Sequence, residues 1–205
     1  NKNLLMNSFS WLDNSGVHNY ILSTNETFIP ILKQLDGLDS YLNTEEIQVV
    51  KTKTMNETIN LMLNSKTFSK DDIFISIMPD TYITNVNLGN EMVSLLQSKS
   101  ELSAVAGLFK IKHYQKGKLG QCKIENGLIK NVIDKDPSCD YEYSWGAMAW
   151  KLDYLPYIYN SDPHIGFSIN PAIESGKKVG YIKSDSDYFD CGTVDEYWKL
   201  IKKLI

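Results

Sequence analysis

The segment DIFISIMPDT, residues 72–81, is the most strand-like part of the sequence. Its first seven residues are mostly apolar and rich in β-branched and aromatic side chains, which is typical of a buried strand. Pro79 follows directly and cannot extend a central ladder of hydrogen bonds. The strand is therefore expected to end at Met78, with Asp80 and Thr81 immediately after it.

Helix and strand patterns alternate around this segment. The expected elements are strands at 18–23, 46–51 and 104–112, and helices over 26–35, after a cap at Asn56 and over 87–98. Strands that alternate with helices are typical of a parallel sheet covered by helices. The first half of the chain therefore predicts a βαβαβα arrangement.

The pattern changes after residue 112. Asn126-Gly127 separates two short strand candidates, and an Asn-Gly pair is a strong hairpin signal. The expected elements here are strands at 120–124, 128–133, 145–150 and 179–183 and a short helix at 171–175 that ends at Gly176. Together the two halves predict a mixed α/β sandwich.

A capping box at residues 193–196 predicts the start of the last helix. Tyr197, Trp198, Ile201 and Leu204 follow at helical spacing. We expect these four side chains to form its buried stripe.

Composition excludes several classes of function. The 205 residues suggest one domain, or one with a small annex. Lys and Arg total 21 against 25 Asp and Glu, and a net charge of −4 argues against a duplex-binding protein. All 21 basic residues are Lys, so an anion must be bound by lysines, backbone N–H groups or a metal rather than by a guanidinium fork.

The remaining composition predicts a cytoplasmic protein without a membrane partner. Three Cys without C-x-x-C spacing and three scattered His give no disulfide framework and no zinc pattern. No apolar run approaches 18 residues and no signal peptide is visible. The first residue is Asn1 rather than Met, which leaves a start upstream open.

Polar residues that follow strands are the first candidates for a site, because ligands of α/β sheets bind beyond the carboxyl ends of the strands. Asp80 and Asp190 are candidate Mg²⁺ ligands, although either can be a turn or loop residue, and Asp185 and Asp187 compete with Asp190. Lys135 is a candidate phosphate ligand, with a solvated lysine as the alternative.

Two other sequence features refine this view. Gly146 within a strand pattern allows close approach of a ligand or of another backbone, with a bulge as the alternative. Neither G-x-G-x-x-G nor G-x-x-x-x-G-K-[ST] is present, so a dinucleotide-binding domain and a P-loop enzyme are unsupported.

Four segments, in this order, resemble the sugar nucleotidyltransferase family, and the MPDT and WG variants resemble its glucose-1-phosphate thymidylyltransferase-like branch. They are IFISIMPDT (73–81), KLGQCKIENGLIKNVIDKDP (118–137), SWGAMAWKLDYL (144–155) and YFDCGTVDEYWKLI (188–201). Lys2-Asn3-Leu4-Leu5 resembles a remnant of the family's early Pro-Lys-Pro-Leu motif. The family's glycine-rich loop, which would precede Lys2, is not in this sequence.

The resemblance implies a three-layer α/β/α, Rossmann-like (GT-A-like) fold with a mixed, mainly parallel sheet. It implies a single domain over 1–205 in which 113–150 form the sugar-binding hairpin region. The implied reaction joins a sugar 1-phosphate to a nucleoside triphosphate with release of pyrophosphate. These two substrates are the expected partners, nucleic acid is not, and a homo-oligomer stays open.

The resemblance also implies roles for individual residues. The implied catalytic residues are Asp80, Lys135 and Asp190, with Asp80 and Asp190 holding Mg²⁺. The implied substrate-binding residues are Lys2, Thr81, Asp134 and Gly146.

Two alternatives remain at this point. The missing loop, Glu57 and Asp136 favour a catalytically degenerate relative that binds a sugar phosphate or a nucleotide sugar, or that acts as an interaction module. A glycosyltransferase is the other alternative, and it would be expected to carry an Asp-x-Asp motif after the central strand. Asp185-Ser186-Asp187 has that form but lies in a late polar segment.

Overall fold

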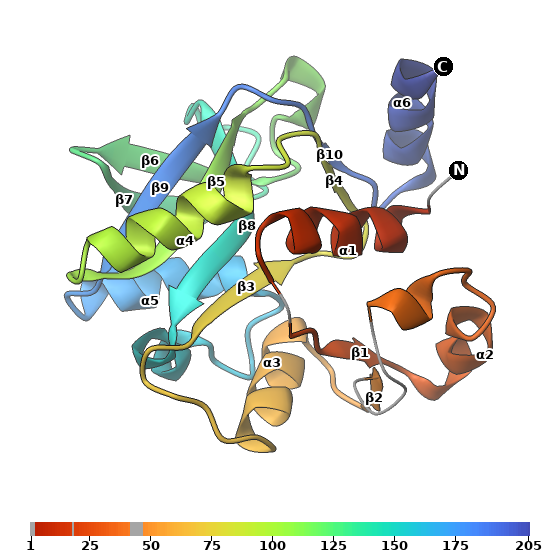
Figure 1. Cartoon of the computed structure of the whole chain (residues 1–205). Helices are drawn as coiled ribbons and strands as arrows, with labels where there is room; N and C mark the ends of the chain where they lie inside the picture. Colours follow the sequence, from red (N-terminus) through yellow and green to blue (C-terminus); the bar gives the residue numbers. More distant parts are fainter. Residues whose placement is uncertain (1–2, 18, 42–46) are drawn as a thin grey trace.

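The computed structural model describes residues 3–17, 19–41 and 47–205 (Figure 1). The α-helices are α1 (Leu4–Asn14), α2 (Ile29–Leu32), α3 (Met55–Asn64), α4 (Leu88–Ser98), α5 (Ile169–Glu174) and α6 (Val194–Leu204). The 3₁₀ helices are η1 (Glu26–Phe28), η2 (Leu38–Ser40), η4 (His113–Gln115), η5 (Leu152–Tyr157) and η6 (Ile165–Ser168).

The strands fall into three sheets. They are β1 (Leu22–Thr24), β2 (Ile47–Val49), β3 (Ile73–Ile77), β4 (Thr81–Ile83), β5 (Leu102–Lys110), β6 (Gly120–Glu125), β7 (Leu128–Asp134), β8 (Tyr143–Lys151), β9 (Lys178–Ser184) and β10 (Tyr188–Asp190). Six of them form the main sheet in the order β3-β8-β5-β9-β7-β6, and β1-β2 and β10-β4 form two smaller sheets. An additional pairing of β6 with β8 closes β8, β5, β9, β7 and β6 into a small barrel.

The expectation of a mainly parallel sheet is wrong. Within the main sheet of the described residues only β5 and β9 pair in parallel, and the other pairings are antiparallel. The reason lies in β8, which enters between β3 and β5 and runs antiparallel to both. β3 and β5 therefore share a direction, as the alternating pattern predicts, but they are not neighbours.

The α/β class itself is confirmed, with apolar layers on both faces of the sheet. Alternate residues of β5 point to opposite faces, as the period of two requires. Ala104, Ala106 and Leu108 pack with α5 and η5 on one face, whereas Val105 packs with α4 on the other. Because both faces are covered, β5 reads as a continuous apolar run.

The hairpin expected around Asn126-Gly127 is confirmed. These two residues have φ values of 51° and 76°, the left-handed pair that a two-residue turn requires, and they join β6 to β7. At α3 the cap differs from the expectation, because Thr54 caps the helix and Asn56 lies in its first turn. Thr54 accepts from Glu57 N at 3.0 Å, and Glu57 accepts from Lys53 N at 2.7 Å. Glu57 therefore forms part of a capping box with Thr54.

Helix α6 begins at the predicted cap but turns a different face inward. Thr193 accepts a hydrogen bond from Glu196 N at 3.3 Å. Glu196 and Leu200 are buried, whereas Tyr197, Trp198 and Leu204 are exposed. The predicted buried stripe is thus wrong, because α6 stands at one corner of the molecule and packs mainly on β10 (Figure 1).

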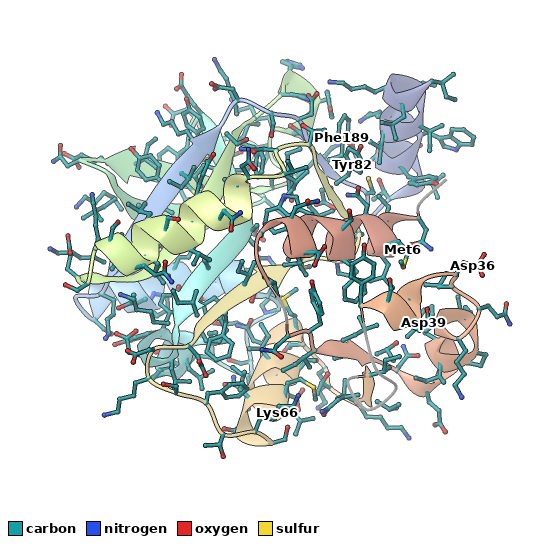
Figure 2. All side chains as sticks on the ribbon, in the orientation of Figure 1. Met6, Asp36, Asp39, Lys66, Tyr82 and Phe189 are labelled. Atoms are coloured by element: carbon teal, nitrogen blue, oxygen red, sulfur yellow. The ribbon has the colours of Figure 1, made fainter. Side chains whose placement is uncertain are left out.

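Two aromatic side chains, labelled in Figure 2, lie in the region where α1, α6 and the β4-β10 sheet meet. Tyr82 and Phe189 have ring centroids 6.4 Å apart, and they cluster with Cys191, Leu200 and Leu4. This small core fixes the start of α6 against the rest of the molecule. None of the described helices is both long and apolar enough to cross a bilayer.

Candidate active site

A cavity of about 1060 Å³ lies where the β3–β4 turn, the start of β6, the end of β7 and helix α6 meet. Five of the predicted site residues line it: Asp80, Thr81, Asp134, Lys135 and Asp190. Residues that are far apart in the sequence thus share one cavity. Lys2 lies outside the described residues.

The carboxylates of Asp80 and Asp190 converge on Gly192. Asp80 follows β3, and Asp190 ends β10, which pairs antiparallel with β4 so that Asp190 lies opposite Thr81. Cys191 N donates to Asp80 O at 2.9 Å, which ties the two segments together. A Cβ atom added to Gly192 would lie 3.1 Å from Asp80 Oδ2 and 3.2 Å from Asp190 Oδ1. Gly192 therefore keeps the space between the carboxylates free of a side chain.

The electrostatics around this pair favour a cation. Burial raises the pKa of Asp80 above its ordinary value, the negative charge of Asp190 raises it further, and a backbone hydrogen bond opposes the shift. Burial and the same two carboxylates raise the pKa of Cys191 to about 11. A divalent cation between Asp80 and Asp190 would relieve this concentration of negative charge.

The donor set fits Mg²⁺ better than a softer metal. Carboxylate oxygens are the ligands that Mg²⁺ prefers, and it commonly keeps several waters and substrate phosphates. Within the described part of the chain, no group of three or more His, Cys, Asp or Glu side chains is placed to hold a metal. Asp80 and Asp190 could therefore hold Mg²⁺ as two protein ligands, with the other positions left to water and substrate.

Thr81 and Gly146 have structural partners. Thr81 is buried, and a side-chain hydrogen bond joins it to Tyr188. A Cβ atom added to Gly146 would lie 2.4 Å from the ring of Tyr188 and 2.7 Å from that of Phe109. Since these two rings stack with centroids 4.7 Å apart, Gly146 makes room for Tyr188 in the cavity wall.

Lys135 has an unusual backbone conformation. Its φ is 53°, in the left-handed region that residues other than glycine rarely adopt, and its N–H donates to Leu119 O at 3.2 Å. Non-glycine residues held in this region cluster at binding sites. Asp136, the next residue, accepts from Ser138 N at 2.8 Å and from Ser138 Oγ at 2.6 Å, and these bonds lower its pKa. Asp136 thus stabilises the following turn.

His164 is a cavity residue that the sequence analysis missed. It lies before η6, and its Nε2 is 3.7 Å from Asp134 Oδ2. Its ring centroid is 5.4 Å from that of Trp145, which also lines the cavity. No spacing rule joins His164 to Asp134, because residues 135–163, which include β8, separate them.

The cavity-facing side of α6 was also missed. Trp198, Lys199 and Lys202 line the cavity from the helix, and Lys118 lines it from the loop before β6. Glu196 Oε1 accepts from Lys118 Nζ at 3.3 Å and from Lys199 Nζ at 2.6 Å. Lys199 and Lys202 are three residues apart and therefore share one face of the helix, and this spacing is the sequence signal that could have marked this wall.

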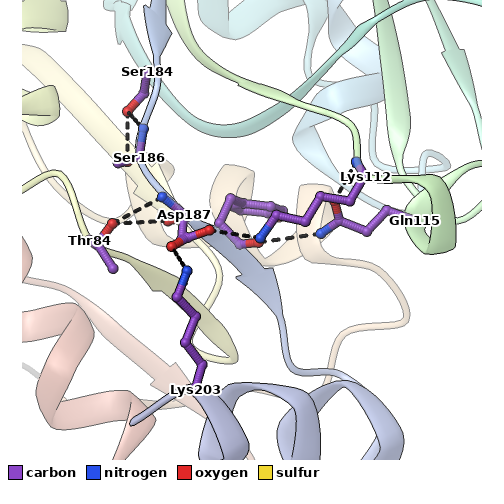
Figure 3. A network of polar contacts seen from close by, with 8 residues as sticks. Thr84, Lys112, Gln115, Ser184, Ser186, Asp187 and Lys203 are labelled. Carbon is purple, nitrogen blue, oxygen red and sulfur yellow. Dashed lines mark hydrogen bonds and ion pairs between the residues drawn. The ribbon is translucent and has the colours of Figure 1, made fainter.

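The carboxylate of Asp187, the last residue of the Asp185-Ser186-Asp187 segment, forms ion pairs with two lysines. Its carboxylate accepts from Lys112 Nζ at 2.8 Å and from Lys203 Nζ, and Figure 3 shows the network. Its backbone N–H donates to Thr84 Oγ1 at 3.1 Å. These contacts tie α6 to the main sheet and give Asp187 a structural role.

The chain shares its fold with solved sugar nucleotidyltransferases. A Bacillus anthracis protein assigned as a glucose-1-phosphate thymidylyltransferase, in complex with sucrose, has a TM-score of 0.77 and 14% identity over 96% of this chain and 80% of that one. A UTP-bound UGPase from Acinetobacter baumannii has a TM-score of 0.70 and 14% identity over 100% of this chain and 82% of that one.

A third structure, a UDP-glucose pyrophosphorylase complexed with UDP-glucose, has a TM-score of 0.68 and 14% identity over 99% of this chain and 86% of that one. No sequence family and no curated protein matches the chain. At these identities the likeness establishes the fold, and the function has to be argued from the cavity.

Proposed function

We propose that this chain joins a sugar 1-phosphate to a nucleoside triphosphate and releases pyrophosphate. The observation that carries the proposal is the convergence of Asp80 and Asp190 on Gly192, in the same cavity that Lys135 lines. Solved structures with this fold hold UTP and UDP-glucose, which supports the same pair of ligand classes here.

In the proposed reaction a phosphate oxygen of the sugar 1-phosphate attacks the α-phosphorus in line, and pyrophosphate leaves. Lys135 would bind the phosphate of the sugar 1-phosphate and offset its charge. Asp80 and Asp190 would hold Mg²⁺, which when bound neutralises phosphate charge and aligns the reacting groups. The chain itself contributes position and charge, because phosphoryl chemistry asks for little else from a protein.

Lysines would carry the remaining phosphate charge. The chain has no Arg, and four lysines line the cavity: Lys118, Lys135, Lys199 and Lys202. Lys118 and Lys199 share Glu196, whereas no carboxylate among the described residues pairs with Lys135 or Lys202. The two lysines without a carboxylate partner are the strongest candidates for phosphate contacts.

Pyrophosphate release tests the proposal. The chain is incubated with Mg²⁺, UTP or dTTP, and glucose 1-phosphate, followed by other triphosphates and sugar 1-phosphates. Asp80→Asn and Asp190→Asn should each lower the rate by about a hundredfold or more while circular dichroism stays unchanged. Asp185→Asn is the matched control, because Asp185 is exposed and lies outside the cavity wall.

The outcome also separates the enzyme from a non-catalytic relative. Failure of every triphosphate and sugar 1-phosphate pair to release pyrophosphate would overturn the enzymatic proposal. Binding of a sugar phosphate or nucleotide sugar without turnover would then favour a binding module built on the same fold.

A further inference from the structure

The end of the cavity next to Lys135 contains a donor and an acceptor that are not joined directly. His164 Nε2 and Asp134 Oδ2 are 3.7 Å apart, which is longer than a direct hydrogen bond. Both side chains are largely buried, with 17% and 22% of their surface exposed, and both line the cavity. One oxygen atom placed beside them can reach both groups.

The surroundings assign the proton of a neutral His164 to Nε2. Nδ1 is buried and has no hydrogen-bond partner in the described part of the chain. A buried N–H without an acceptor is costly, whereas an N–H on Nε2 points toward a carboxylate. His164 therefore presents a donor to the cavity, and Asp134 presents an acceptor beside it.

Such a pair is complementary to a hydroxyl group. A hydroxyl oxygen can accept from His164 and donate to Asp134 at the same time. An ammonium group has no lone pair with which to accept, and a carboxylate or phosphate has no proton to donate to Asp134. The geometry thus favours an uncharged hydroxyl at this position.

The packing around the pair holds it in place. The His164 ring contacts two aromatic rings, with its centroid 5.4 Å from that of Trp145 and 4.8 Å from that of Phe167. Trp145 in turn fills the space of two absent side chains, because Cβ atoms on Gly120 and Gly166 would lie 2.3 and 2.4 Å from its ring atoms. These ring contacts restrict the rotation of the His164 side chain and so help to keep the donor in position, which selectivity requires.

We infer that His164, together with Asp134, determines sugar specificity by binding one neutral hydroxyl of the sugar ring. The inference rests on the proposed function, since Lys135, the residue after Asp134, would hold the phosphate of the same ligand. A sugar that lacks this hydroxyl would leave the buried donor and acceptor unpaired, and a site of this kind rejects such an analogue.

Direct binding tests the inference without turnover. Calorimetry measures the Kd of glucose 1-phosphate and of its 2-, 3-, 4- and 6-deoxy analogues, with galactose and mannose 1-phosphates as further probes. The wild-type chain should bind one deoxy analogue about tenfold to a hundredfold more weakly than the parent sugar. The amino analogue at that position should bind as weakly as the deoxy analogue.

Two variants of His164 separate its donor from its packing. His164→Phe keeps an aromatic ring next to Trp145 and Phe167 but has no donor, so it should bind the parent and that deoxy analogue with nearly equal Kd. His164→Gln keeps an N–H near the position of Nε2 and should retain the preference. His113→Phe is the matched control, because His113 is exposed and lies outside this cavity.

The results distinguish a failure of the role of His164 from a failure of the proposed function. A preference that survives in His164→Phe, with thermal melting showing a folded variant, would overturn the role of His164 and leave the proposed function intact. Equal binding of all deoxy analogues by the wild-type chain would do the same. If the wild-type chain binds no sugar 1-phosphate and no triphosphate and sugar 1-phosphate pair releases pyrophosphate, the proposed function falls, and this inference falls with it.

Discussion

At the scale of single residues, Gly192 matters because its missing side chain leaves space between the carboxylates of Asp80 and Asp190. It is exposed, its φ lies outside the left-handed region, and alanine is therefore compatible with its backbone. A methyl group there would stand 3.1 and 3.2 Å from the two carboxylate oxygens and would fill the space between them. The fold should tolerate the methyl group, but the methyl group should leave no room for a cation between the carboxylates.

We expect Gly192→Ala to lower Mg²⁺-dependent pyrophosphate release at least about tenfold, which corresponds to about 1.4 kcal/mol. The free energy of unfolding should change by less than about 1 kcal/mol. The specific readout is the rise in melting temperature on adding Mg²⁺, which should be present in the wild-type chain and lost in the variant. A Mg²⁺ shift of unchanged size in Gly192→Ala would place the cation elsewhere.

At Gly146, unlike at Gly192, we expect substitution by alanine to destabilise the fold. A methyl group at this position would overlap the rings of Tyr188 and Phe109, at 2.4 and 2.7 Å, and both rings are buried. Gly146→Ala should therefore destabilise the chain by about 1–3 kcal/mol in urea unfolding, the usual cost of overpacking a core. A variant with wild-type stability but weaker sugar phosphate binding would instead support a direct contact between this backbone and the substrate.

The residues that could be predicted are those next to strong local patterns. Asp80 follows the most strand-like segment of the sequence, Asp190 precedes a capping box, and Lys135 directly follows a hairpin strand. All three line the cavity. His164 could not be found in this way, because it lies in a loop before η6 and its partner Asp134 is the last residue of β7. Whether these residues bind metal and substrate stays a prediction, which the pyrophosphate and binding experiments address.

At the scale of elements, helix α6 is held by ion pairs as well as by apolar packing. Lys203 on α6 and Lys112 before η4 both pair with Asp187, and both ammonium groups also lie over the ring of Phe189. The hydrogen bonds from Lys112 and Lys203 lower the pKa of Asp187 below its ordinary value of 3.8. The network therefore stabilises the fold when Asp187 is ionised.

Asp187→Asn should lower the free energy of unfolding by about 1 kcal/mol at neutral pH, since the pairs are partly exposed to solvent. Above pH 3.8 the free energy of unfolding of the variant should differ from that of the wild type by this full amount. The difference should vanish as the pH falls through the lowered pKa of Asp187. Urea unfolding between pH 2.5 and 7 measures it, with Asp185→Asn as the control. A difference that grows toward acid pH would contradict this account.

Element boundaries were predictable where the local pattern is strong, whereas helix α1 and strands β4 and β10 were not predicted, and neither were the neighbours of each strand. The hairpin turn at Asn126-Gly127 and the cap at Thr193 follow from local chemistry, and both are observed. The position of β8 between β3 and β5 does not follow from local chemistry, because strand order depends on pairing between segments some seventy residues apart. The exposed face of α6 was misjudged for a related reason, since helical periodicity shows that a stripe exists but not what it faces.

At the scale of the whole molecule, the cavity is assembled from parts that side chains hold together. Its walls come from the β3–β4 turn, from residues 117–120 and from α6. The ion pair between Glu196 and Lys118 joins the last two. Glu196 also pairs with Lys199 within α6, and the Lys199 ammonium lies 4.1 Å from the ring centroid of Tyr114. A ligand that fills the cavity would contact several of these walls at once and would oppose their separation.

Binding of UTP with Mg²⁺ should therefore slow hydrogen exchange in α6 and in residues 113–120 together. At a ligand concentration of 100 times Kd, the stabilisation of about 2.7 kcal/mol corresponds to about hundredfold slower exchange for amides that open only in the unbound state. No residue of helix α5 lines the cavity, so this helix serves as the internal reference. Protection confined to residues 113–120 at saturating UTP would mean that α6 moves independently of the cavity, and the assembly of the site through Glu196 would then be wrong.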